Sequence, residues 1–291
     1  MKKFAFILLA LLGLSSCSEY NSVVKSDDYG RKFDLANEIY EKGSRPNFDK
    51  NGNPKVNGDG DIVVKSNTLL RSVTLYEQVY ERMPKSGEGE LSYFRIGKAY
   101  YLSGDYYMGG YYLGVFPKRF PFSPKAEEAM FLSAMCSVHN SPTFSLDQNE
   151  TEIAIANLQG FLYNYPNSIL VDSCNHIIDR LYFKLEKKDY ESVLLYNKTS
   201  NYSAAVTSAL TFMEDHPMSI YEEEVYYILV DNSVLLAKNS IENKKKERIE
   251  NAIERYRNFA VRYPESNELK ALGPRIGDLE EELKVIELSS N

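Results

Sequence analysis

The sequence predicts an all-α protein in which about five helix pairs stack into an α-solenoid, with one inserted loop or hairpin near residues 43–66. Five prolines recur in one context, and each is followed two residues later by a serine. Each also has a bulky apolar residue five positions before it and a small residue twelve positions before it. The five segments are aligned on their prolines alone. The serine, the bulky residue and the small residue that recur at fixed distances from each proline therefore independently support a repeated helix pair. The five prolines are Pro84, Pro121, Pro166, Pro217 and Pro264.

Each column has a physical role in a helix pair. A small residue lets the second helix approach the first, and a bulky residue fills the space towards the next repeat. Proline ends the helix because it lacks an amide donor, and the serine can cap the next helix. The bulky residues are Val79, Phe116, Phe161, Phe212 and Phe259. The small residues are Ser72, Gly109, Ala154, Ala205 and Ala252.

The clearest unit lies at residues 90–123. Tyr93, Ile96 and Tyr100 are three or four residues apart, so they share one face of a first helix. Gly104 and Asp105 then separate it from a second helix. This unit resembles a tetratricopeptide repeat, whose period is about 34 residues.

The N-terminal segment predicts a lipoprotein. Residues 1–16 combine an early pair of lysines with a short apolar core, which is typical of a signal peptide. The core is followed by Leu14-Ser15-Ser16-Cys17, which resembles a bacterial lipobox. We therefore expect Cys17 to be acylated and residues 17–28 to form a polar tether; an ordinary signal peptide is the alternative. Residue 18 is serine rather than the aspartate of inner-membrane retention signals, so we expect an outer-membrane anchor facing the periplasm.

Residues 29–272 are expected to form the solenoid. The first helix is predicted at 29–42 and its partner from about residue 67, with turn signals such as Asn51-Gly52 and Asn57-Gly58 in the insertion between them. Asn57, Asp59 and Asp61 begin like a calcium loop, but Ile62 replaces the required glycine, which favours turns over a metal site.

Further helices are expected along the remaining repeats. Their predicted ranges are 125–138, 152–165, 171–196, 203–214, 220–237 and 247–262. The helix at 171–196 is expected to be either long or broken near Lys187–Asp189. Residues 273–291 are expected to form a capping tail with a helix at 279–288.

The sequence contains no motif that indicates an enzyme or a cofactor. Glycine-rich phosphate loops, G-x-S-x-G and H-E-x-x-H are absent from it. A net charge of −7 also argues against a nucleic-acid partner. Cys136 and Cys174, with histidines nearby, could form a zinc site or a disulfide, but buried thiols are the favoured interpretation.

Together, the lipobox and the five repeats resemble the BamD family of lipoproteins, which belong to the machinery that inserts β-barrels into bacterial outer membranes. The best local match lies in the fourth unit, and the resemblance covers most of residues 29–272. The insertion and the 23 tyrosines depart from the proteobacterial pattern and suggest a Bacteroidetes-type member. The matching segments are Tyr165-Pro166-Asn167-Ser168, Asp179-Arg180-Leu181, Lys184-Leu185 and Asn201-Tyr202-Ser203-Ala204-Ala205.

The resemblance implies a non-enzymatic scaffold. In that family the C-terminal repeats dock the barrel-forming subunit BamA, and the N-terminal repeats bind the aromatic C-terminal signal of unfolded outer-membrane proteins. Two other functions remain open: a periplasmic adaptor for cell-wall enzymes, and a glycan-binding lipoprotein of the SusD kind.

Helical spacing nominates the residues of a groove on the stacked first helices. Phe94, Lys98 and Tyr101 share a face at i, i+4 and i+7. We expect the aromatic side chains to hold substrate aromatics and Lys98 to attract a terminal carboxylate, unless other helices cover these positions. Equivalent positions in the third repeat include Phe131 and Met135. Those in the fifth repeat, where we expect partner docking, are Tyr227, Asp231 and Val234.

Overall fold

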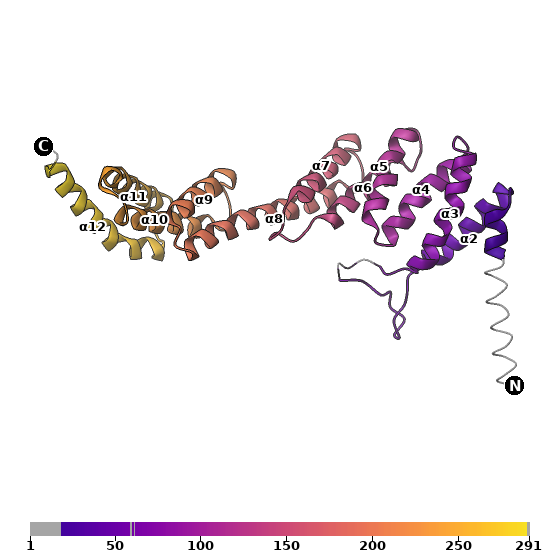
Figure 1. Cartoon of the computed structure of the whole chain (residues 1–291), viewed down its shortest axis with the longest axis horizontal. Coiled ribbons are helices and arrows are strands. Elements are labelled where there is room, and N and C mark those ends of the chain that lie inside the picture. The colour runs from indigo at the N-terminus through magenta and orange to yellow at the C-terminus, as the bar shows by residue number, and fades with distance from the viewer. Residues whose placement is uncertain (1–18, 59, 61, 290–291) are drawn as a thin grey trace. The chain divides into compact units, whose positions relative to one another are not determined.

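The computed structural model describes residues 19–58, 60 and 62–289, and within them it confirms the predicted all-α repeat fold (Figure 1). Pairing of extended backbone in this part of the chain is limited to isolated bridges in the insertion. The helices are α2 (Tyr29–Gly43), α3 (Ser66–Arg82), α4 (Gly87–Leu102), α5 (Tyr106–Arg119), α6 (Ala126–Asn140), α7 (Asn149–Asn164), α8 (Val171–Lys198), α9 (Tyr202–Asp215), α10 (Glu222–Lys238), α11 (Glu242–Arg262) and α12 (Asn267–Ser289).

The repeat columns explain where the helices end and what they bury. The second helix of every pair ends two residues before its repeat proline. The five bulky residues and the five small residues are all buried. After the prolines, Ser86 caps α4 by accepting a bond from the Gly89 amide at 3.0 Å. The serines of the third and fifth units instead accept bonds from the amides two residues on, at Lys125 and Tyr221.

Glycines in the second repeat permit close helix packing. A Cβ on Gly97 would lie 2.8 Å from the Leu113 Cγ, and one on Gly109 would lie 3.0 Å from the Tyr101 amide nitrogen. The contact at Gly97 is closer than real Cβ atoms show, and the one at Gly109 is tighter than nearly all real Cβ contacts, so glycine at these positions allows α5 to lie this near α4. Around them the tyrosines interlock, with the Tyr93 ring 5.3 Å from the Tyr112 ring.

The helices form two compact units. The first extends to Pro142 and includes Asp147–Ile178, and the second contains Thr143–Leu146 and the chain from Asp179 onward. The repeat spacing predicted one extended solenoid and no division near residue 178. Helix α8 passes from one unit into the other as 28 continuous residues, so of the two predicted alternatives, a long helix or one broken near Lys187–Asp189, the long helix is present.

The predicted tether differs from the structure. Residues 1–18, which include Cys17, lie outside the described residues, but residues 19–25 are helical. Val23 is buried, and the Tyr20 hydroxyl donates a hydrogen bond of 3.0 Å to the Arg71 carbonyl. This segment packs on the first repeat because its apolar side chains find a surface there.

The C-terminal cap is also longer than predicted. Helix α12 begins at Asn267, and Pro274 lies inside it. Leu269, Leu272, Ile276 and Leu279 recur at helical spacing and are buried against α10 and α11. Their packing keeps the helix continuous past a residue that usually ends one.

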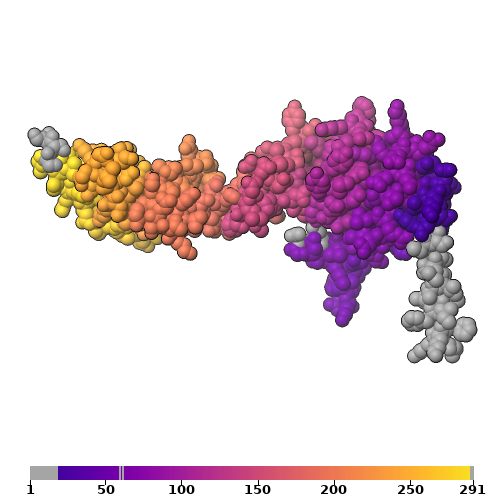
Figure 2. All heavy atoms as spheres, viewed as in Figure 1, coloured from indigo at the N-terminus to yellow at the C-terminus, as the bar shows by residue number. Residues whose placement is uncertain are grey.

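The insertion between α2 and α3 forms an arm, defined here as residues 44–65. It stands out from the surface of the first unit (Figure 2). The predicted hairpin is present as three antiparallel bridges, including Val56 with Ile62 and Pro46 with Val64. The Lys65 amide donates to the Gly43 carbonyl at 3.0 Å and closes the base of the arm.

Candidate functional site

A hollow of about 410 Å³ lies on the face made by α2, α4 and α6, the first helices of repeats one to three. Its charged groups come from all three helices and from the residue before α6. The stacked first helices therefore form a concave surface with both cationic and apolar character. The lining residues are Tyr40, Glu41, Ser44, Leu91, Phe94, Arg95, Lys98, Leu102, Lys125 and Glu128.

Arg95 joins the first two repeats. Its guanidinium donates to the Asn37 side-chain oxygen at 2.8 Å and to the Tyr76 hydroxyl at 3.0 Å, and it pairs with Glu41 at 2.9 Å. Burial raises the pKa of Tyr76 to about 12, so its hydroxyl stays protonated and donates to Asn37 at 2.7 Å. With these bonds satisfied, Arg95 is chiefly a structural clamp at one wall of the hollow.

Two lysines face the ring of Phe94. The ammonium of Lys98 lies 5.8 Å from the ring centroid and that of Lys125 lies 5.3 Å from it, which is within cation–π range. Lys98 also pairs with Glu128 at 2.5 Å, whereas no acidic group among the described residues pairs with Lys125. Lys125 is therefore the cation most available to an incoming anion.

The structure brings together only part of the predicted groove. Phe94 and Lys98 meet in the hollow, but Phe94 is 4% exposed and packs edge-on against Phe116 at 5.4 Å. Phe94 therefore forms the floor, which corrects the expectation of an exposed aromatic. Phe131 and Met135 are half-buried on α6 and do not line the hollow, because Phe131 packs on Phe161 at 5.6 Å.

Sequence reasoning missed Lys125. It lies at the start of the third repeat, where its side chain is brought to Phe94 of the second repeat. The prediction considered one face of each first helix separately. It therefore did not place the start of α6, where Lys125 lies, next to the middle of α4, where Phe94 lies. The sequence does contain a signal for Lys125. It directly follows Ser123-Pro124, which mark the start of α6, the first helix of the third repeat.

The predicted docking residues in the fifth repeat are largely covered. Val234 is fully buried in the core shared by α10, α11 and α12, so it offers no surface to a partner. Asp231 forms an ion pair with Arg275 of α12, and Tyr227 is half-buried. The prediction placed α12 too late in the chain, and the additional turns cover this face of α10.

The two cysteines in the described residues are free thiols and are buried. The Cys136 sulfur packs against Gly109, and burial raises the pKa of this thiol to about 12. The His139 ring stacks on Tyr106 at 4.1 Å. In residues 19–58, 60 and 62–289 no cluster of three metal-ligating side chains occurs. These contacts agree with the interpretation of Cys136 and Cys174 as packed apolar groups.

The paired helices and their cap define a tetratricopeptide-type α-solenoid with a concave, partly cationic face. Residues 59–209 and 184–290 match the family model YfiO, which is described as an outer membrane lipoprotein. Together these segments cover most of the chain, so the chain belongs to this family of outer-membrane lipoproteins. The family assignment confirms the resemblance inferred from the sequence and supports an outer-membrane location.

A curated relative agrees with this assignment. The outer membrane protein assembly factor BamD of Caulobacter vibrioides is 24% identical over 168 residues, which is 58% of this chain and 55% of that protein. The chain thus spans about half the length of this relative. Within the described residues, no helix combines the length and apolar character needed to cross a membrane.

Proposed function

We propose that the protein is a non-enzymatic lipoprotein scaffold in the assembly of outer-membrane β-barrels. In this proposal, acylated Cys17 anchors it to the outer membrane on the periplasmic side. The first unit binds the C-terminal segment of unfolded outer-membrane proteins, and the second unit docks a BamA-like barrel protein. Family membership and the relative named for outer-membrane protein assembly support this function.

The hollow with Lys125 is the observation that carries the substrate-binding part. A C-terminal segment presents a carboxylate next to apolar side chains, and the hollow offers an ammonium beside an aromatic floor. The Lys98–Glu128 pair is partly exposed, with side-chain exposures of 32% and 44%, so it contributes only about 0–1 kcal/mol. An incoming carboxylate can therefore compete with Glu128 for Lys98 and take Lys125 without breaking a strong interaction.

Replacing Lys125 by glutamate is expected to weaken binding of a peptide with a free C-terminal carboxylate about tenfold, or ~1.4 kcal/mol. The reversal puts a negative charge where the carboxylate should lie. Affinity can be measured by fluorescence anisotropy with the detergent-solubilised full-length protein and a ten-residue peptide ending in phenylalanine. An amidated version of the peptide should bind weakly to both proteins.

The matched control is Lys85→Glu, which makes the same charge change at an exposed lysine outside the hollow. It should leave the affinity within about twofold, since this side chain is exposed, does not line the hollow, and carries a charge that salt screens. Equal losses from the two variants, or equal binding of the free and amidated peptides, would contradict carboxylate recognition at this hollow.

The docking part of the proposal concerns the second unit. Tyr227 and Asp231 keep part of their side chains exposed, and we propose that this edge of α10, together with Arg275 of α12, contributes to the partner surface. A neighbouring hollow between α11 and α12 is lined by four glutamates and two cations, and one cation, Arg257, pairs with Glu280. Its net negative charge is suited to a basic partner segment.

A pull-down from detergent-solubilised native membranes tests the assembly role. A C-terminally tagged protein is expected to co-purify a large protein with periplasmic repeats and a C-terminal β-barrel, identified by mass spectrometry. An unrelated tagged outer-membrane lipoprotein is the control for non-specific capture. Recovery of only cell-wall enzymes or of a glycan transporter would instead favour an adaptor or a glycan-binding lipoprotein.

A further inference from the structure

The arm leaves the first unit at the edge where the described chain begins. The Tyr20 hydroxyl bonds to the carbonyl of Arg71, which lies five residues after the start of α3, and the arm ends directly before that start. The buried side chains of Val23 and Val64 belong to one apolar cluster, so the N-terminal helix and the base of the arm share a core. We call this edge, where α2 ends and α3 begins, the anchor edge.

The tether between this edge and the proposed lipid is short. Helical structure begins at Glu19, and Cys17 lies only two residues before it. Two residues of fully extended chain span at most about 7 Å. Acylation of Cys17 therefore holds the anchor edge at the surface of the bilayer, and it places the base of the arm there as well.

The arm exposes apolar side chains on each of its three passes of the chain. Phe48 is 57% exposed, Val56 is 60% exposed and Ile62 is 51% exposed. Exposed apolar side chains that gather on one element are typical of a surface that binds a membrane or another protein. Because the tether keeps this element at the bilayer, the membrane is the occupant that the geometry favours.

The backbone of the arm is suited to a site with little water. The Asn47 amide donates to the Val63 carbonyl at 2.8 Å, the Val63 amide to the Lys55 carbonyl at 2.8 Å, and the Lys55 amide to the Asn47 carbonyl at 2.7 Å. These bonds join the three passes in a ring. Backbone groups that are paired with one another lose less on leaving water than unpaired groups do.

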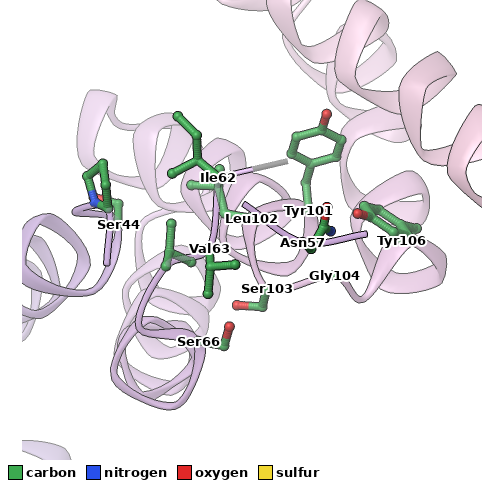
Figure 3. A pocket seen from close by; sticks show the side chains of 12 residues that line it. Ser44, Asn57, Ile62, Val63, Ser66, Tyr101, Leu102, Ser103, Gly104 and Tyr106 are labelled. Carbon is green, nitrogen blue, oxygen red and sulfur yellow. The ribbon is translucent and has the colours of Figure 1, made fainter. Parts of the chain in front are cut away.

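The helices hold the arm in place from one side. Ile62 and Val63 line a hollow of about 460 Å³ together with Tyr101 and Tyr106, which lie at the end of α4 and the start of α5 (Figure 3). The turn between α4 and α5 therefore also lies at the anchor edge. An arm that is already supported loses little conformational freedom when it meets a membrane.

Charge contributes little to this contact. The sequence of the arm contains four lysine or arginine residues and three aspartates, so its net charge is only +1. A strong dependence on anionic lipid is not expected for so small a charge. The exposed apolar side chains supply the attraction.

We propose that the arm is a second membrane contact, in which Phe48 and its apolar neighbours enter the interfacial region of the phospholipid bilayer that holds the lipid of Cys17. The function proposed above assigns no role to the arm, and this inference rests on the anchoring part of that function. A lipid attachment alone leaves the first unit free to rotate about its tether. A second contact fixes this rotation and so determines which face of the repeats is turned away from the membrane.

The test places a tryptophan in the arm, because the chain contains none. The acylated full-length variant Phe48→Trp is reconstituted into vesicles of phosphatidylethanolamine and phosphatidylglycerol at about 3:1. Its fluorescence is compared between vesicles with brominated acyl chains, which quench tryptophan on contact, and unbrominated ones. We expect bromination to lower the emission by about half.

The matched control is Phe122→Trp, the same substitution at a ring that is 98% exposed. Phe122 lies three residues after the end of α5, whose 14 residues span about 21 Å from the anchor edge. Its emission should fall by less than about a tenth in the brominated vesicles.

The outcomes separate this inference from the function on which it rests. Protein that floats with the vesicles but shows no quenching of Phe48→Trp would overturn the arm contact and leave the anchor intact. Equal quenching of the two variants would also overturn it, since general adsorption to the vesicles would then explain the data. Protein that did not float, or that mass spectrometry showed to lack acyl chains on Cys17, would contradict the proposed anchor, and the arm contact would fail with it.

Discussion

Replacing Phe116 by alanine is expected to lower the free energy of unfolding by about 3–5 kcal/mol. Phe116 is fully buried in the second repeat, and its ring contacts those of Phe94 at 5.4 Å and Phe120 at 5.1 Å. Truncation removes the contact between α4, α5 and α6 and leaves a cavity that rigid helices cannot fill. Urea unfolding followed by circular dichroism measures the loss.

The matched control is Phe122→Ala, the same substitution six residues later at a ring that is 98% exposed. It should change the stability by less than about 0.5 kcal/mol. Similar losses from the two variants, or a loss below ~1 kcal/mol at Phe116, would show that the aromatic column does not hold the repeats together.

Replacing Gly89 by alanine is expected to destabilise the first unit by about 3 kcal/mol or more, at the upper end of the cost of overpacking. A Cβ at this position would lie 1.9 Å from the Met83 carbonyl oxygen. Because the clash is with backbone, the turn between α3 and α4 must move to relieve it. Thermal unfolding measures the effect as a lower midpoint temperature.

Gly87→Ala is the control at the same end of α4. A Cβ there meets nothing within 4 Å, so alanine should be neutral or should stabilise by up to about 1 kcal/mol through its higher helix propensity. If both variants unfolded alike, the close approach of α4 to the preceding turn would not be the cause.

The repeat pattern was enough to predict most of the fold. The proline column marked the end of every second helix, and the small and bulky columns named residues that are all buried. The interval between Pro166 and Pro217 is longer than one repeat and predicted an additional stretch of helix, either long or broken, which is present as the continuous helix α8. Residue spacing predicts the fold here because each repeat packs chiefly on the repeats next to it in the chain. The spacing within one repeat therefore indicates which residues are buried against its neighbours.

The site was predicted only in part. Helical spacing found Phe94 and Lys98, but it could not show that Phe94 forms a buried floor or that Lys125 from the next repeat lies over it. It also could not show that α12 covers Val234. In each case the deciding contact joins residues on different helices.

The sequence by itself therefore determined the helices, their register and the residues that hold neighbouring repeats together, because those features follow from periods of a few residues. Only the tertiary structure decided which charges are engaged and which apolar surfaces remain available. Glu41 reaches Arg95 across 54 residues and Glu128 reaches Lys98 across 30 residues. The arm meets the α4–α5 turn in the same way. Such pairings depend on the angles and offsets at which helices pack, and these arise from the fit of whole surfaces rather than from any local period.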